Sequence, residues 1–162
     1  MSSLSDPSLI FRIPKDTVAQ SLRFMQQQGA VGHEGVALWP GRLTGNVCEI
    51  GDALIPRQIT RERFYRIPTD ETFRIIQHVA EQGLVIPIQI HSHPHEAFHS
   101  WADDEHAFVQ HENAISIVVP NFADFPFSEF LSKARFYRLR SGNEWDEIEK
   151  SEIDESLIFV DL

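Results

Sequence analysis

The pattern of apolar and polar positions predicts both helices and strands in this chain. Apolar side chains recur at helical spacing over residues 14–29 and 69–83. Short stretches rich in Val, Ile and Leu predict strands at 35–38, 47–56, 84–90, 114–119, 135–139 and 145–148. This order of elements is typical of an α+β fold (mixed α/β) with a central mixed β-sheet flanked by helices.

The predicted helices have recognisable ends. The first, residues 14–29, ends on Gly29, where a glycine C-cap is expected. The second, residues 69–83, begins with Thr69 as the N-cap candidate. A third helix is expected over residues 100–111. The strands at 35–38 and 47–56 are expected to pair in antiparallel fashion, as are those at 135–139 and 145–148.

The composition is that of one globular domain spanning residues 1–162. The chain has 162 residues, of which 42% are hydrophobic, and its prolines and glycines are scattered instead of gathered in a linker. The one cysteine, Cys48, excludes an internal disulfide and a thiolate zinc finger, which favours the cytoplasm. The N-terminal residues do not resemble a signal peptide, and the longest apolar run, residues 84–90, is far shorter than a membrane span.

The charge balance argues against two classes of partner. Lys and Arg total 14 against 24 Asp and Glu, so the net charge is −10. Such a chain repels phosphate backbones and anionic lipids, and we therefore expect neither a nucleic acid nor a membrane as partner. Residues 143–155 hold seven of the acids and one lysine, a run that is typical of a solvated face.

A cluster of histidines follows the predicted strand at 84–90. Six of the eight histidines lie between residues 91 and 111. His91 and His93 are two residues apart on a strand, so their side chains point to the same face. Asp103 follows His93 by ten residues, at the start of the third predicted helix, and could add a carboxylate. Two imidazoles and one carboxylate leave a coordination position open, as in catalytic zinc sites.

Other interpretations of these residues remain open at this point. Ser100 and Asp103 also fit a helix capping box, and Asp104 competes with Asp103 as the ligand. The remaining histidines of the cluster are expected to face solvent or to make local hydrogen bonds; they are His95, His99, His106 and His111. Three other histidine-rich families match the sequence poorly. A metallo-β-lactamase would need an aspartate two residues after the second histidine, and a TIM-barrel amidohydrolase would need a longer chain. A cupin would need an all-β fold, which the predicted helices contradict.

The sequence resembles a known motif. Glu34, then His91-Ser92-His93-Pro94, then Ser100-x-x-Asp103 resemble the JAMM motif of JAB/MPN-domain metalloproteases, although six residues instead of about seven separate His93 from Ser100. The resemblance implies the MPN/JAB (cytidine-deaminase-like) fold and one zinc ion per chain, held by His91, His93 and Asp103. It also implies that Glu34 acts through the zinc-bound water and that Ser100 donates a hydrogen bond to the oxyanion. Glu49 is the less favoured substitute for Glu34.

The resemblance also implies a substrate. Family members hydrolyse isopeptide or peptide bonds after the C-terminal tail of ubiquitin-like proteins, and small bacterial members occur in antiphage operons beside E1-like and E2-like enzymes. We therefore expect a ubiquitin-like protein and its conjugates as partners. Candidate substrate-binding residues lie in a basic stretch, which could equally be a solvated loop, and in an aromatic stretch, which core packing would also explain. They are Arg57, Arg61, Arg63, Phe125 and Phe127.

Two alternative functions follow from the same resemblance. Some relatives are catalytically silent MPN scaffolds, but these usually lose motif residues, and here each motif position holds a competent residue. Other relatives are JAB hydrolases that act on a small sulfur-carrier protein. Substrate assays would separate this second alternative from an isopeptidase.

Overall fold

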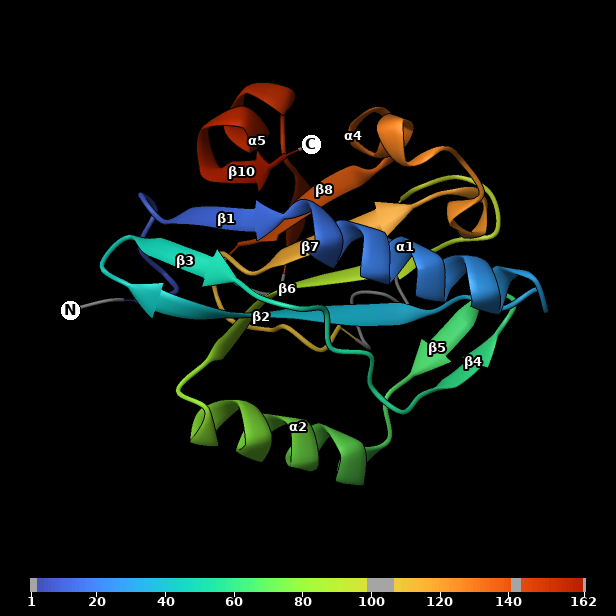
Figure 1. Ribbon diagram of the computed structural model, residues 1–162, viewed down its shortest axis with the longest axis horizontal. Helices are drawn as coiled ribbons and strands as arrows, with labels where there is room; N and C mark the ends of the chain where they lie inside the picture. The colour runs from blue at the N-terminus through green and yellow to red at the C-terminus, as the bar shows by residue number, and fades with distance from the viewer. Residues whose placement is uncertain (1–2, 99–106, 141–143, 162) are drawn as a thin grey trace.

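A mixed β-sheet forms the centre of the computed structural model, which describes residues 3–98, 107–140 and 144–161 (Figure 1). Within these residues one sheet has eight strands, in the order β10 (Leu157–Val160), β1 (Ile10–Pro14), β3 (Val47–Ile50), β2 (Val36–Thr44), β6 (Val85–Ser92), β7 (Ile115–Val119), β8 (Arg135–Leu139) and β9 (Trp145–Glu147). Strand β1 is parallel to both neighbours and β6 is parallel to β7, whereas the other pairs are antiparallel. The expected α+β fold with a mixed sheet is confirmed.

Two helices cover opposite faces of this sheet, α1 (Lys15–Gly29) and α2 (Thr69–Glu81) (Figure 1). Successive side chains of β2 pack alternately with α1 and with α2. Ala37 and Trp39 belong to the main core with the buried face of α1, while Val36 and Leu38 pack with the buried face of α2. Alternation along one strand therefore supplies both cores.

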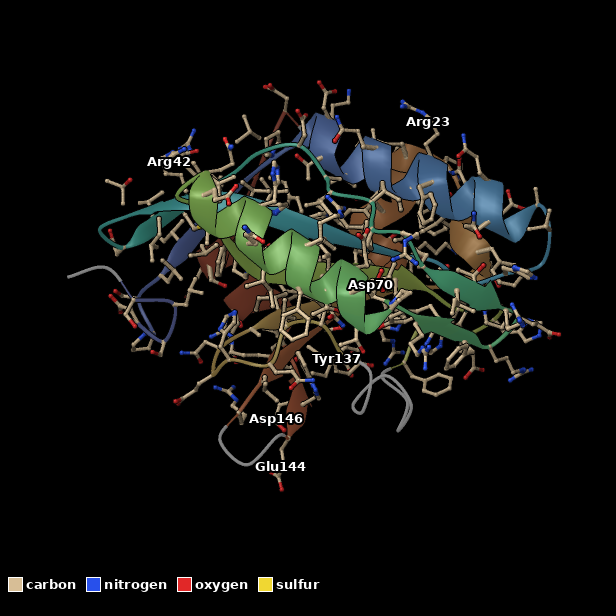
Figure 2. All side chains as sticks on the ribbon, turned by 90° about the horizontal axis from the view of Figure 1, so that it is seen from below. Arg23, Arg42, Asp70, Tyr137, Glu144 and Asp146 are labelled. Atoms are coloured by element: carbon tan, nitrogen blue, oxygen red, sulfur yellow. The ribbon has the colours of Figure 1, made fainter. Side chains whose placement is uncertain are left out.

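The remaining elements are short. A separate hairpin consists of β4 (Ile59–Arg61) and β5 (Phe64–Arg66). Two single turns, at Asn121–Ala123 and Phe127–Glu129, precede the short helix α4 (Phe130–Lys133). Helix α5 (Lys150–Ser156) leads into β10. In Figure 2, Asp70 marks the start of α2, on the side where the hairpin lies.

Most of the predicted elements are present. The helix at 14–29 is α1, and the strands at 84–90 and 114–119 are β6 and β7. The pair expected at 135–139 and 145–148 is the antiparallel pair of β8 and β9. The other expected pair is β2 and β3, but β2 continues through Pro40 and Gly41 with a register shift, and the turn lies at Gly45 and Asn46.

Three local predictions were wrong. Thr69 is the first residue of α2, and Pro68 occupies the N-cap. The third helix does not extend over residues 107–111, which are irregular because the Gln89 Oε1 accepts the backbone N–H groups of Phe108 and Val109 at 2.8 and 3.2 Å. Gly29 is the last residue of α1 and not its C-cap, which is the residue that follows.

The part of the chain that the structure describes contains no helix with both the length and the apolar character needed to cross a bilayer. The expected solvated acidic face is confirmed, because all seven acids in residues 143–155 are exposed or half-exposed on β9, on α5 and in their connections.

Candidate metal centre

The two histidines of the motif stand at the end of the central strand β6. His91 pairs with Val36 of β2 on one side and with Val118 of β7 on the other, so its backbone is fixed from both directions. Both side chains are buried, with exposed fractions of 0% and 5% for His91 and His93. Their Nε2 atoms lie 3.3 Å apart. The strand therefore directs two imidazole nitrogens to one point, as the spacing predicts.

Hydrogen bonds around His93 fix its ring and its backbone. The Nδ1 atom lies 3.1 Å from the carbonyl oxygen of Glu96, which can only accept, so Nδ1 donates, and in the neutral ring Nε2 keeps the lone pair that a metal ion would take. The His93 N–H donates to the Val119 carbonyl at 2.9 Å, and the His93 carbonyl accepts from Phe122 at 2.8 Å. Metal-binding histidines commonly have such a partner on the second nitrogen.

A left-handed turn at Asn121–Ala123 supplies part of this support. Its three residues have φ values of 54°, 52° and 61°, a conformation that costs roughly 1–2 kcal/mol for each non-glycine residue. Helix α1 braces the turn, because Gln26 Nε2 donates to the Ala123 carbonyl at 3.0 Å. The turn also requires a glycine at position 29, because a Cβ atom there would lie 2.4 Å from the Cβ of Phe122. Contacts with α1 therefore keep this strained turn in place next to the histidines.

Glu34 lies in the loop that leads into β2, next to His93. Its exposed fraction is 4%, and it lines a cavity of about 170 Å³ together with His93, Arg63 and Phe98. The next residue, Gly35, is tied to β6, since its N–H donates to Ser92 Oγ and its carbonyl accepts from the Ser92 N–H, both at 3.0 Å. A buried carboxylate and an imidazole therefore face the same small space.

The two histidines fit a zinc ion. Zinc binds imidazole nitrogen at about 2.0–2.1 Å in tetrahedral geometry, which separates two ligand nitrogens by roughly 3.3–3.4 Å. The observed distance between the Nε2 atoms is 3.3 Å. Among the described residues no three metal-binding side chains come together. The expected third ligand, Asp103 or its alternative Asp104, lies outside the described residues, and so does Ser100.

Comparison with known proteins decides the family. The model of a family described as prokaryotic homologs of the JAB domain matches residues 24–132, which include Glu34, His91 and His93. The chain belongs to this prokaryotic JAB family. A relative from Sinorhizobium fredii, named a probable metalloprotease, is 34% identical over 156 residues, which are 91% of this chain and 92% of the relative.

Two solved structures share the fold of this JAB chain at 16% identity. A protein from Desulfitobacterium hafniense, solved in solution, has a TM-score of 0.65 over 93% of this chain and 92% of its own. A JAB1/MPN domain protein from Archaeoglobus fulgidus, solved by crystallography, has a TM-score of 0.50 over 93% and 98%. The expected JAB/MPN fold is confirmed.

The other candidate residues of the JAB chain lie in two different places. Arg63 lines the cavity with Glu34, and the carbonyl of Arg61 accepts the Glu34 N–H at 2.8 Å. Arg57 forms an ion pair with Asp70 at 2.5 Å. By contrast, two aromatic candidates are partly buried and pack against the main core, which supports the alternative of core packing; they are Phe125 and Phe127. Glu49 is exposed on β3, where it forms an ion pair with Arg12, so the structure favours Glu34 over it.

Sequence reasoning missed several neighbours of the site in the JAB chain. The ring of Tyr65 lies 5.2 Å from that of His91, and Phe98 meets His93 edge-on at 4.9 Å. Gln58 accepts the Val36 N–H at 2.9 Å and donates to the Val36 carbonyl at 3.0 Å, so its side chain continues the sheet where β3 has ended. The alternation in Phe64-Tyr65-Arg66 is the only sequence signal for the hairpin that carries Tyr65.

Two side chains with shifted pKa values, Glu71 and Cys48, lie away from the metal centre. The hydrogen bond from Arg74 lowers the pKa of Glu71 to about 2, and the backbone N–H of Arg57 also donates to Glu71 at 2.6 Å. Glu71 thus anchors the base of the β4–β5 hairpin. Burial raises the pKa of Cys48 to about 11, and this inert thiol lies in the main core.

Proposed function

We propose that this JAB protein is a zinc-dependent peptidase or isopeptidase that cleaves after the C-terminal tail of a ubiquitin-like protein, either to remove conjugates or to process precursors. The observation that carries the proposal is the convergence of the His91 and His93 Nε2 atoms at 3.3 Å beside the buried Glu34. Membership of the JAB family and a relative named a probable metalloprotease support a metallopeptidase in general.

In this proposal the residues divide the chemistry among themselves. His91, His93 and Asp103, or Asp104 in its place, would hold one zinc ion. When bound, zinc polarises a carbonyl and lowers the pKa of a water to about 7. Glu34 would take the proton of the attacking water and pass it to the leaving amine, a contribution of roughly 10²- to 10⁴-fold. Ser100 would donate a hydrogen bond to the oxyanion of the tetrahedral intermediate.

The surroundings of Glu34 suit an extended tail of small residues. The cavity of about 170 Å³ is small, which suits a tail of glycines. The nearby edge of β2 is closed to strand addition by the bridge between Leu38 and Leu54 and by the two hydrogen bonds of Gln58. An added strand would therefore use the β4–β5 hairpin, where the exposed side chains of Arg61 and Arg63 could contact the partner.

Cleavage of ubiquitin-like fusions tests the proposal. The substrates end in Gly-Gly followed by an extension, and wild type, Glu34→Ala and chelator-treated protein are assayed in parallel. Cleavage after the terminal glycine is expected in wild type alone. Glu49→Ala serves as the matched control and should keep full activity, because Glu49 is exposed on β3. One zinc ion per chain without cleavage of any fusion would refute the peptidase and favour a scaffold or a hydrolase of sulfur-carrier proteins.

A further inference from the structure

The β4–β5 hairpin is too small to hold its own position. Each strand has three residues, and isolated two-stranded hairpins are marginally stable at best. Figure 1 shows the hairpin outside the main sheet, near the C-terminal end of α1. Its tip residues Arg61, Glu62 and Arg63 are exposed, and Tyr65 is its one buried residue. Contacts from other segments must therefore place it beside Glu34.

The central contact of β4 is the Thr60 hydroxyl. Its Oγ1 atom lies 3.0 Å from Gln28 Oε1 and 3.0 Å from His33 Nδ1. The amide oxygen of Gln28 can only accept, so the hydroxyl donates its single hydrogen to Gln28 and accepts from the Nδ1–H of His33. One side chain of β4 thus joins the end of α1 to the loop that precedes Glu34.

The same strand holds Glu34 itself. The Glu34 N–H donates to the Arg61 carbonyl at 2.8 Å, one residue after Thr60. The His33 N–H donates to the Gln28 carbonyl at 3.0 Å, so Gln28 binds this loop through both its backbone and its side chain. A movement of β4 would consequently break contacts on two consecutive residues, His33 and Glu34.

We propose that Thr60 is a positioning residue, whose hydroxyl holds the hairpin on the 33–34 loop so that the Glu34 carboxylate is in place before substrate arrives. Groups held in the reactive geometry beforehand need no reorganisation during the reaction. The kinetic part of this inference rests on the proposed peptidase function. The structural part, a hairpin ordered in the free protein, does not.

Amide hydrogen exchange of the full-length protein, without substrate, tests the structural part. Thr60→Val removes the hydroxyl at nearly constant shape, and Thr60→Ser keeps it. Exchange at residue 34 and over 59–66 should be at least about five-fold faster in Thr60→Val, the factor that corresponds to one hydrogen bond, and near wild type in Thr60→Ser. Thr44→Val makes the same change in an exposed part of the β2–β3 hairpin and should leave both regions unchanged.

Kinetics on the fusion substrates tests the second part. Thr60→Val should lower kcat about 5- to 30-fold with unchanged zinc content, and Thr60→Ser should restore kcat. Gln28→Ala removes the other partner of the contact, so it should speed amide exchange at residue 34 and over 59–66 as Thr60→Val does. Wild-type exchange in Thr60→Val, or failure of Thr60→Ser to restore protection, would overturn the inference. Absence of cleavage by wild type would refute the proposed function, while the exchange result would still decide whether Thr60 holds the hairpin.

Discussion

The two halves of the site are built on different supports. His91 and His93 stand on or directly after a central strand that has neighbours on both sides. Glu34 lies in a loop that is held by a small exposed hairpin through side-chain and single backbone hydrogen bonds. The imidazole half is therefore as stable as the sheet, whereas the position of the carboxylate depends on a few polar contacts. The two halves should respond differently to substitution.

The largest effect is expected from His91→Ala. This substitution removes a fully buried side chain that we assign to the metal, so the variant should contain no zinc and lose about 1–3 kcal/mol of unfolding free energy besides the metal contribution. Zinc content by mass spectrometry and the melting temperature with and without chelator measure this. His111→Ala, outside the site, is the control. One zinc ion per chain in His91→Ala would remove this histidine from the ligand set.

Glu34→Gln should separate the two halves. The substitution keeps the shape of the side chain but removes its basic oxygen, so kcat on the fusions should fall about 10²- to 10⁴-fold. Zinc content and melting temperature should stay at wild-type values because the imidazole half is untouched. Loss of zinc in this variant would show that Glu34 binds the metal and that the two halves are not independent.

Gly29→Ala should disturb the imidazole half from a distance. The new Cβ would lie 2.4 Å from Phe122 Cβ, so the left-handed turn must shift, at a cost of about 1–3 kcal/mol. Because this turn binds the His93 carbonyl, we expect zinc affinity to fall roughly ten-fold. Gly51→Ala is the control, since a Cβ there meets open space. Equal zinc affinity in both variants would mean that the turn does not position His93.

Glu71→Gln should have the smallest effect, on the anchor of the hairpin. The pKa of Glu71 is lowered from 4.5 to about 2, so its stabilising contribution is present above pH 4.5 and is lost as the pH falls towards 2. The variant should lose about 1–2 kcal/mol at pH 7, and its difference from wild type should narrow below pH 4.5. Urea unfolding at several pH values measures this. Glu81→Gln, on the exposed face of α2, is the control and should leave the unfolding free energy at pH 7 unchanged.

The parts of the fold that bury long apolar stretches could be predicted from the sequence. The run at 84–90 and the helical pattern at 14–29 became β6 and α1 because burial of their side chains decides their conformation. The spacing of His91 and His93 predicted their convergence for the same reason, since period-two alternation on a buried strand leaves no alternative.

The parts held by single polar contacts could not be predicted. The side-chain oxygen of Gln89 accepts two backbone N–H groups within residues 107–111, which in a helix would donate to backbone carbonyls. No local sequence pattern indicates these two hydrogen bonds. Strands β4 and β5 have three residues each and carry charged side chains, so their pairing depends on contacts made with the rest of the fold. The left-handed conformation at Asn121–Ala123 has no glycine to indicate it.

The arrangement of the outer strands has a consequence for synthesis of the chain. Strand β1 lies between β3 and β10, and its residue Phe11 pairs with Leu157. Residues 157–160 leave the ribosome long after residues 10–14, so one side of β1 stays uncovered while the residues between them are synthesised. Pairing across so long a separation is slow, because a large loop must close before any contact forms. The nascent chain is therefore most exposed to strand-mediated aggregation along β1 until residues 157–160 emerge.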